Sequence, residues 1–108
     1  MFLSIHDREK AIVRYRLIFA IKGERFSMYN GHDFDGGYPF DFEDQQTAAT
    51  HAQIEAAKIA LSGPYPARRS IVVQRHDQHG DKVDFTEVMT FNIEANSQRV
   101  DLVTEVLP

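Results

Sequence analysis

The stretch that decides the fold is DFEDQQTAATHAQIEAAKIALSG, residues 41–63. Its alanines recur with the period of an α-helix, which predicts an amphipathic helix whose small side chains let it lie close to a sheet. Asp41 and Asp44 are alternative N-cap residues, and Gly63 followed by Pro64 is typical of a helix end. The predicted buried stripe consists of Ala49, Ala52, Ala56, Ile59 and Ala60, flanked by Ile54 and Leu61.

A β-hairpin is predicted before this helix, in RYRLIFAIKGERFSMYN, residues 14–30. Apolar side chains alternate along its first strand, and Lys22-Gly23 supplies a two-residue turn. This turn pairs Phe19 with Phe26 and matches the apolar faces of the two strands. A three-residue loop would shift the register by one position and expose the more apolar face of the first strand.

A second hairpin is predicted after the helix, in SIVVQRHDQHGDKVDFTEVMTFNI, residues 70–93. We place a type I turn from Asp77 to Gly80, with the glycine left-handed. That register pairs Val73 with Phe85. The same face of the strand then continues through Met89, Phe91 and Ile93.

The C-terminal segment SQRVDLVTEVLP, residues 97–108, is rich in β-branched residues and favours a further strand. A short helix with Val100, Val103 and Leu107 facing inward is the alternative. The order ββαββ with a C-terminal strand predicts one α+β domain over residues 1–108. We expect two layers, a mainly antiparallel sheet with the alanine-rich helix packed on one face.

The composition limits the classes of function. The 108 residues include no cysteine, which excludes disulfides, thiolate metal sites and a thiol nucleophile. No apolar run approaches the roughly 20 residues that span a bilayer, and the first ten residues turn charged too early for a signal peptide. We therefore expect a cytoplasmic protein that is not bound to membranes.

Nucleic-acid binding is disfavoured by the net charge of −4, because such proteins usually carry a basic balance. The basic candidates for a local contact with nucleic acid are Arg14, Arg16 and Arg25, with Tyr29 beside them.

The segment MYNGHDFDGGYPFDFED, residues 28–44, is rich in acids and aromatics but does not fit a calcium loop. With Gly36 at the sixth position of an EF-hand loop, the first position is Gly31 and the twelfth is Phe42, so two essential carboxylates are missing. We expect no metal and no cofactor. The segment is interpreted as a structured connection that also forms the lip of a binding site.

No catalytic constellation is recognised, because the serines lack a nucleophile motif and the histidines lack the spacing of a zinc site. The alternative function is a small ligand-binding protein or enzyme, with its site between the 31–44 loop and the 76–81 turn. Its candidate residues are His32, Asp33, Asp35, Tyr38, His76 and His79.

From about residue 14 to residue 93 the chain resembles a family of small uncharacterised bacterial ββαββ proteins. The resemblance is carried by RYRLIFAI in the first strand, DFED before the alanine-rich helix, and VVQRHDQHGDKV in the second hairpin. The longer aromatic loop at 31–42 and the extended tail depart from it. The resemblance implies the fold and a bacterial or phage origin, and it implies no catalytic residue because the family has no assigned activity.

The function predicted first is a non-enzymatic binding or regulatory module that acts through protein–protein contacts. The expected class is that of bacterial or phage-encoded inhibitor or immunity proteins. An uncovered sheet face and an apolar tail that can pair outside its own sheet favour a homodimer or a protein partner. The expected contact residues are Ile12, Arg14, Arg16, Ile18, Val100, Leu102 and Val106.

Overall fold

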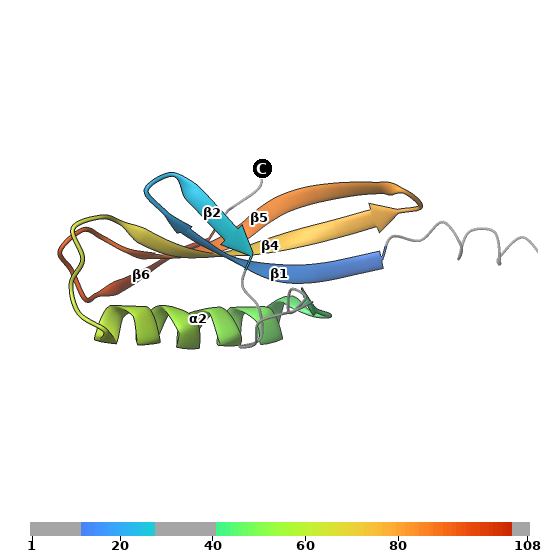
Figure 1. The fold of residues 1–108 in the computed structure, drawn as a ribbon. Helices are drawn as coiled ribbons and strands as arrows, with labels where there is room; N and C mark the ends of the chain where they lie inside the picture. The colour runs from blue at the N-terminus through green and yellow to red at the C-terminus, as the bar shows by residue number, and fades with distance from the viewer. Residues whose placement is uncertain (1–11, 28–40, 105–108) are drawn as a thin grey trace, which may run out of the picture.

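The computed structural model describes residues 12–27 and 41–104, which form six strands and one helix (Figure 1). In chain order these are β1 (Ile12–Ile21), β2 (Glu24–Ser27), β3 (Asp41–Phe42), α2 (Gln45–Leu61), β4 (Arg69–His79), β5 (Lys82–Ile93) and β6 (Val100–Thr104). The strands form one antiparallel sheet in the order β2-β1-β4-β5-β6, with β3 also paired to β1. The predicted α+β fold with one helix on one sheet face is confirmed.

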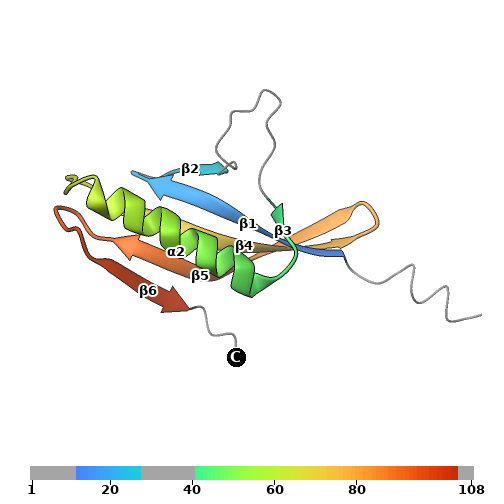
Figure 2. The same cartoon turned by 90° about the horizontal axis from the view of Figure 1, so that it is seen from below.

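The helix lies along the middle of the sheet, with β2 at one edge and β6 at the other (Figure 2). Its buried residues are the alanines at 48, 52, 56 and 60, spaced four apart. Of the predicted stripe, Ala52, Ala56 and Ala60 are buried and Ala49 and Ile59 are half-buried, whereas the flanking Ile54 and Leu61 are exposed. The smallest side chains face the sheet because they permit the closest helix–sheet approach. Beneath them, the largest fully buried side chains are Ile71, Val73 and Ile93.

The choice between the two N-cap candidates is resolved in favour of Asp44. Its carboxylate accepts hydrogen bonds from the backbone N–H of Thr47 at 2.8 Å and from the Thr47 hydroxyl at 3.1 Å. These bonds lower the pKa of Asp44 because they favour its ionised form. Asp41 instead belongs to β3, where it pairs with Arg16 of β1.

The first hairpin has the predicted register. Lys22 and Gly23 both have positive φ, 52° and 82°, as a type I′ turn requires. Phe19 pairs with Phe26, and their rings stack with centroids 6.4 Å apart.

The predicted register of the second hairpin is wrong. Strand β4 continues past Asp77, where the turn was predicted, to His79. His79 pairs with Lys82 of β5 around a two-residue turn at Gly80 and Asp81. Val73 pairs with Met89 and not with Phe85. The longer ladder supplies additional backbone hydrogen bonds, and Gly80 adopts the positive φ of 60° that the turn needs.

A β-bulge between Val73 and Gln74 restores the apolar match that this register would otherwise lose. The pairing jumps from Val73–Met89 to Gln74–Glu87, which leaves one extra residue in β5. An extra residue reverses the side-chain alternation. Phe85 therefore lies beside His76 on the sheet face opposite α2, whereas Met89, Phe91 and Ile93 face the core.

The C-terminal segment forms a strand, as the β-branched residues predicted. In β6, Leu102 pairs with Phe91 of β5, and Val100 packs at the margin of the core. Val106 lies outside the described residues.

The face opposite α2 is partly covered. Arg25 of β2 forms an ion pair with Glu87 of β5. Arg25 is in the row of Ala20, and Glu87 is in the row of Arg16, so the pair passes over the intervening row that contains Ile18 and Val72. Ile18 lies on this outward face, as predicted, but its side chain is only 7% exposed in the single chain.

Candidate functional site

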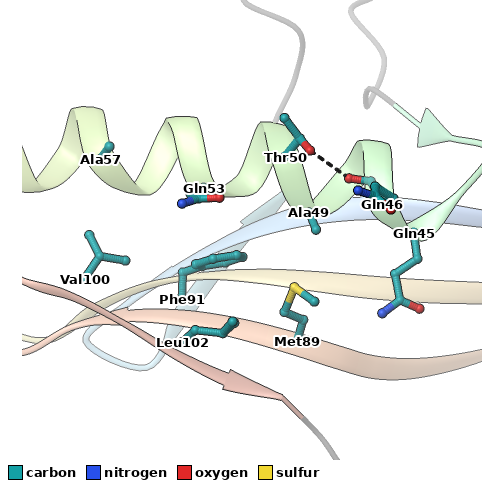
Figure 3. Close-up of a pocket in the computed structure, with 10 residues that line it drawn as sticks. All are labelled: Gln45, Gln46, Ala49, Thr50, Gln53, Ala57, Met89, Phe91, Val100 and Leu102. Carbon is teal, nitrogen blue, oxygen red and sulfur yellow. Dashed lines mark hydrogen bonds between the residues drawn. The ribbon is translucent and has the colours of Figure 1, made fainter.

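A groove of about 630 Å³ runs between α2 and the strands β5 and β6 (Figure 3). Apolar side chains of the two strands form one side of it, and small or amide-bearing side chains of the helix form the other. The lining residues are Gln45, Gln46, Ala49, Thr50, Gln53, Ala57, Met89, Phe91, Val100 and Leu102.

The groove is apolar on its strand side and uncharged throughout. The helix contributes the residues at 45, 49, 53 and 57, spaced four apart in a stripe beside the buried alanines. Thr50 is tied to its own helix, because its hydroxyl donates to the carbonyl oxygen of Gln46 at 3.0 Å. Side-chain amides along an apolar floor suit an uncharged segment that brings apolar side chains and its own hydrogen-bonding groups.

The sheet edge beside this groove is exposed. In the described part of the chain no strand pairs with the outer side of β6. Leu102 is 54% exposed and Val103 is 46% exposed, and these neighbours project to opposite faces of the strand. The charged residue Asp101 is paired with Arg99 of the same segment at 2.9 Å. An edge with apolar side chains on both faces favours pairing with another strand.

A second hollow, of about 370 Å³, lies on the opposite face of the sheet, near the β4–β5 hairpin. It is lined from three sides, by β1, by β3 and by the hairpin. We call it the open-face hollow, and its lining residues are Ile12, Arg14, Arg16, Asp41, His76, Gln78, Val83 and Phe85.

Of the two arginines that line the open-face hollow, one is paired with a carboxylate and the other is not. The Arg16 guanidinium donates to both carboxylate oxygens of Asp41, at 3.0 and 3.4 Å. Among the described residues, Arg14 makes no side-chain hydrogen bond or ion pair. His76 is buried with Nε2 at 2.8 Å from Oε1 of Gln74, and its burial and the nearby Arg16 charge lower its pKa. Near pH 7 the hollow therefore presents a neutral imidazole and one guanidinium available to a ligand.

The structure brings some of the predicted site residues together and separates others. Ile12, Arg14, Arg16 and His76 meet in the open-face hollow, although the sequence assigned them to two different sites. Val100 and Leu102 line the groove on the other face. His79 is exposed at the end of β4 and does not line the hollow. The other candidate binding residues, His32, Asp33, Asp35 and Tyr38, lie outside the described residues.

Two features of these sites were not predicted from the sequence. The four-residue spacing of Gln45, Ala49, Gln53 and Ala57 was the available signal for the groove, because it marks a helix face flanking the buried stripe. The place of Phe85 in the open-face hollow had no comparable signal, since the bulge reverses its orientation.

Residues 12–27 and 41–104 contain few groups that could form a metal site or a catalytic site. No set of three or more His, Asp and Glu side chains in these ranges could hold a metal ion. His76 is bound to an amide and not to a carboxylate that would orient it as a general base. No helix in the same ranges is long and apolar enough to cross a bilayer.

No family model, curated protein or solved structure matches this chain. The resemblance to small bacterial ββαββ proteins, and the bacterial or phage origin that it implies, therefore stay predictions.

Proposed function

We propose that this chain is a non-enzymatic binding module that acts through protein–protein contacts, with the β6 edge and the adjoining groove as its contact surface. The observation that supports it most directly is the exposure of Leu102 and Val103 on the two faces of an edge strand. Burying both side chains against a partner is favourable, and the unpaired backbone groups of the edge supply hydrogen bonds for it.

The partner that this edge suits is a second copy of the same chain. With a two-fold axis at Leu102, each Leu102 faces its counterpart and each Asp101 faces a Val103. No like charges then lie directly opposite one another, and such pairs would destabilise the strand pairing. The Arg99–Asp101 pair also compensates the only acidic side chain within β6.

The groove completes this interface. Antiparallel pairing of identical edges places the two-fold axis perpendicular to the sheet, so both α2 helices lie on the same face. The two grooves then adjoin across the axis. Each Leu102 is covered by the groove of its own chain and by the Leu102 of the second copy. A specific dimer buries about 800 Å² on each partner, which is why we include the groove side chains with the edge strand.

The oligomeric state of the full chain tests this proposal. Sedimentation equilibrium at tens of micromolar is expected to give the mass of a dimer. Leu102→Lys and, separately, Val103→Lys are expected to raise the dimer dissociation constant by more than about tenfold. Each variant places a lysine ammonium in the interface, where it has no oppositely charged partner. Both side chains are about half exposed in the single chain, so the variants are expected to retain its melting temperature.

Phe26→Lys is the matched control, because Phe26 is similarly exposed, at 48%, on the opposite edge strand β2. This variant is expected to remain dimeric. A monomer mass for the unaltered chain would refute self-association. Dissociation by Phe26→Lys alone would move the interface to β2 and overturn the assignment to β6.

A further inference from the structure

The open-face hollow combines features that the proposed dimer does not use. It lies on the face opposite α2, close to the β4–β5 hairpin, whereas the proposed interface follows the β6 edge and the groove on the helix side. Its volume of about 370 Å³ falls in the range of sites for small organic molecules.

One wall of the hollow is an exposed apolar cluster. Ile12 is 54% exposed and Phe85 is 59% exposed, and the half-buried Val83 lies in the same cross-strand row as Ile12. The Phe85 ring is held edge-on against the buried His76, with centroids 4.7 Å apart and an angle of 90° between the planes. A ring fixed in this way offers a pre-organised apolar surface to a ligand.

The adjoining wall carries a cation that the described residues do not neutralise. Arg14 is in the same cross-strand row as His76 and Phe85. The neighbouring Arg16 is occupied by Asp41, whereas Arg14 has no hydrogen-bonded or ionic partner in residues 12–27 and 41–104. A guanidinium binds a carboxylate through two parallel hydrogen bonds, so Arg14 selects an anion of that geometry.

We infer that the open-face hollow binds a small aromatic carboxylate, with its ring against Phe85, Ile12 and Val83 and its carboxylate on Arg14. The apolar wall supplies affinity by burial of the aromatic ring, and the guanidinium supplies selectivity for the charged group. Neutral His76 adds no second cation, which limits the preference to ligands with one negative charge near the ring.

The test is a titration of the ¹⁵N-labelled full chain, followed by NMR, with 2-naphthoate and with its neutral analogue 2-naphthylmethanol. We expect 2-naphthoate to bind saturably and to shift the amide signals of Arg14, His76 and Phe85. The alcohol is expected to bind about tenfold more weakly, as the loss of one charge-assisted contact implies. Equal affinity for the two probes, or signal changes confined to the groove residues Met89 and Leu102, would overturn the inference.

Variants separate the two parts of the proposed site. Arg14→Gln is expected to lower the affinity for 2-naphthoate about tenfold and to leave the affinity for the alcohol unchanged. Phe85→Ala is expected to weaken the binding of both probes, because it removes the apolar wall that they share. Arg99→Gln, which removes an exposed arginine of the β6 segment, is the control and is expected to change neither affinity. Unchanged 2-naphthoate binding in Arg14→Gln would also overturn the inference. Because these titrations do not depend on the β6 edge, their outcome is independent of the dimer test.

Discussion

Phe85 of β5 packs edge-on against His76 of β4, with the ring centroids 4.7 Å apart, on the sheet face that α2 does not cover. The contact exists because the bulge at Val73 and Gln74 reverses the side-chain alternation of β5. It covers one side of the His76 ring with hydrocarbon, which contributes to the burial of the imidazole.

The first prediction concerns the pH dependence of stability. Burial and then the charge of Arg16 lower the pKa of His76, while Asp41 and Asp77 oppose this effect. The unfolded chain therefore binds a proton more readily at this residue than the folded chain does. As pH falls below about 6.5, the ordinary pKa of histidine, the free energy of unfolding is expected to decrease until pH passes the lowered pKa.

His76→Gln is expected to flatten this part of the stability curve, measured by urea denaturation between pH 7.5 and pH 4.5, roughly the interval over which histidine titrates. His79→Gln, an exposed histidine at the end of the same strand, serves as the control and is expected to leave the slope unchanged. An unaltered slope in His76→Gln would show that other groups cause the acid destabilisation.

The second prediction concerns the contact between the helix and the sheet. Ala56 is fully buried, whereas its neighbour Ala57 is exposed. Ala56→Leu is expected to lower the free energy of unfolding by about 1–3 kcal/mol, because the larger side chain forces the helix away from the sheet. Ala57→Leu makes the same chemical change at an exposed helix position that borders the groove, and it is expected to alter stability by less than about 0.5 kcal/mol. Denaturation of both variants compares the two positions directly, and equal effects would contradict the close packing.

The third prediction concerns Arg69, a buried arginine at the start of β4. Its guanidinium donates to the carbonyl oxygens of Ile59 and Gly63 at the C-terminal end of α2, and to that of Ser97 before β6. It also lies 5.5 Å from the centroid of the Tyr65 ring. The negative end of the helix dipole favours a cation in this place.

Arg69→Ala is expected to destabilise the fold by about 2–4 kcal/mol, because the carbonyl groups of Ile59, Gly63 and Ser97 lose charged hydrogen-bond donors and the buried side chain is removed. Arg68→Ala is the adjacent control, since Arg68 is exposed and its ion pair with Glu94 at 3.1 Å contributes at most about 1 kcal/mol. Thermal and urea denaturation of the two variants measure the difference. Similar losses in both would mean that the Arg69 contacts contribute little.

The fourth prediction concerns metal ions. Zinc and calcium, each in moderate excess, are expected to leave the melting temperature unchanged. A metal ion that bound only the folded chain would raise this temperature. The sequence contains no complete ligand set at its acidic segment. A reproducible rise that disappears in the double variant Asp33→Asn/Asp35→Asn would contradict this prediction and assign the ion to that segment.

Local chemistry explains which parts of the fold were predictable. The alanine period determined the helix, Asp44 and Gly63 are suited to its two ends, and Lys22-Gly23 determined the first turn and its register. Each of these features depends on residues within a few positions of one another, so helix capping and turn chemistry are sufficient to predict them. The strand at Val100–Thr104 was predictable for the same reason, from its β-branched residues.

Only the tertiary structure decided which side chains form the two candidate sites. The turn predicted at Asp77–Gly80 was wrong, and the observed register instead pairs Val73 with Met89 and Ile71 with Phe91 across the sheet. The resulting bulge placed Phe85 beside His76 and Arg14. Ile18 is likewise buried on a sheet face that is crossed by an ion pair between Arg25 and Glu87, 62 positions apart in the chain. These placements depend on packing between segments that are far apart in the chain. Local sequence patterns do not determine such packing, which becomes fixed only in the complete fold.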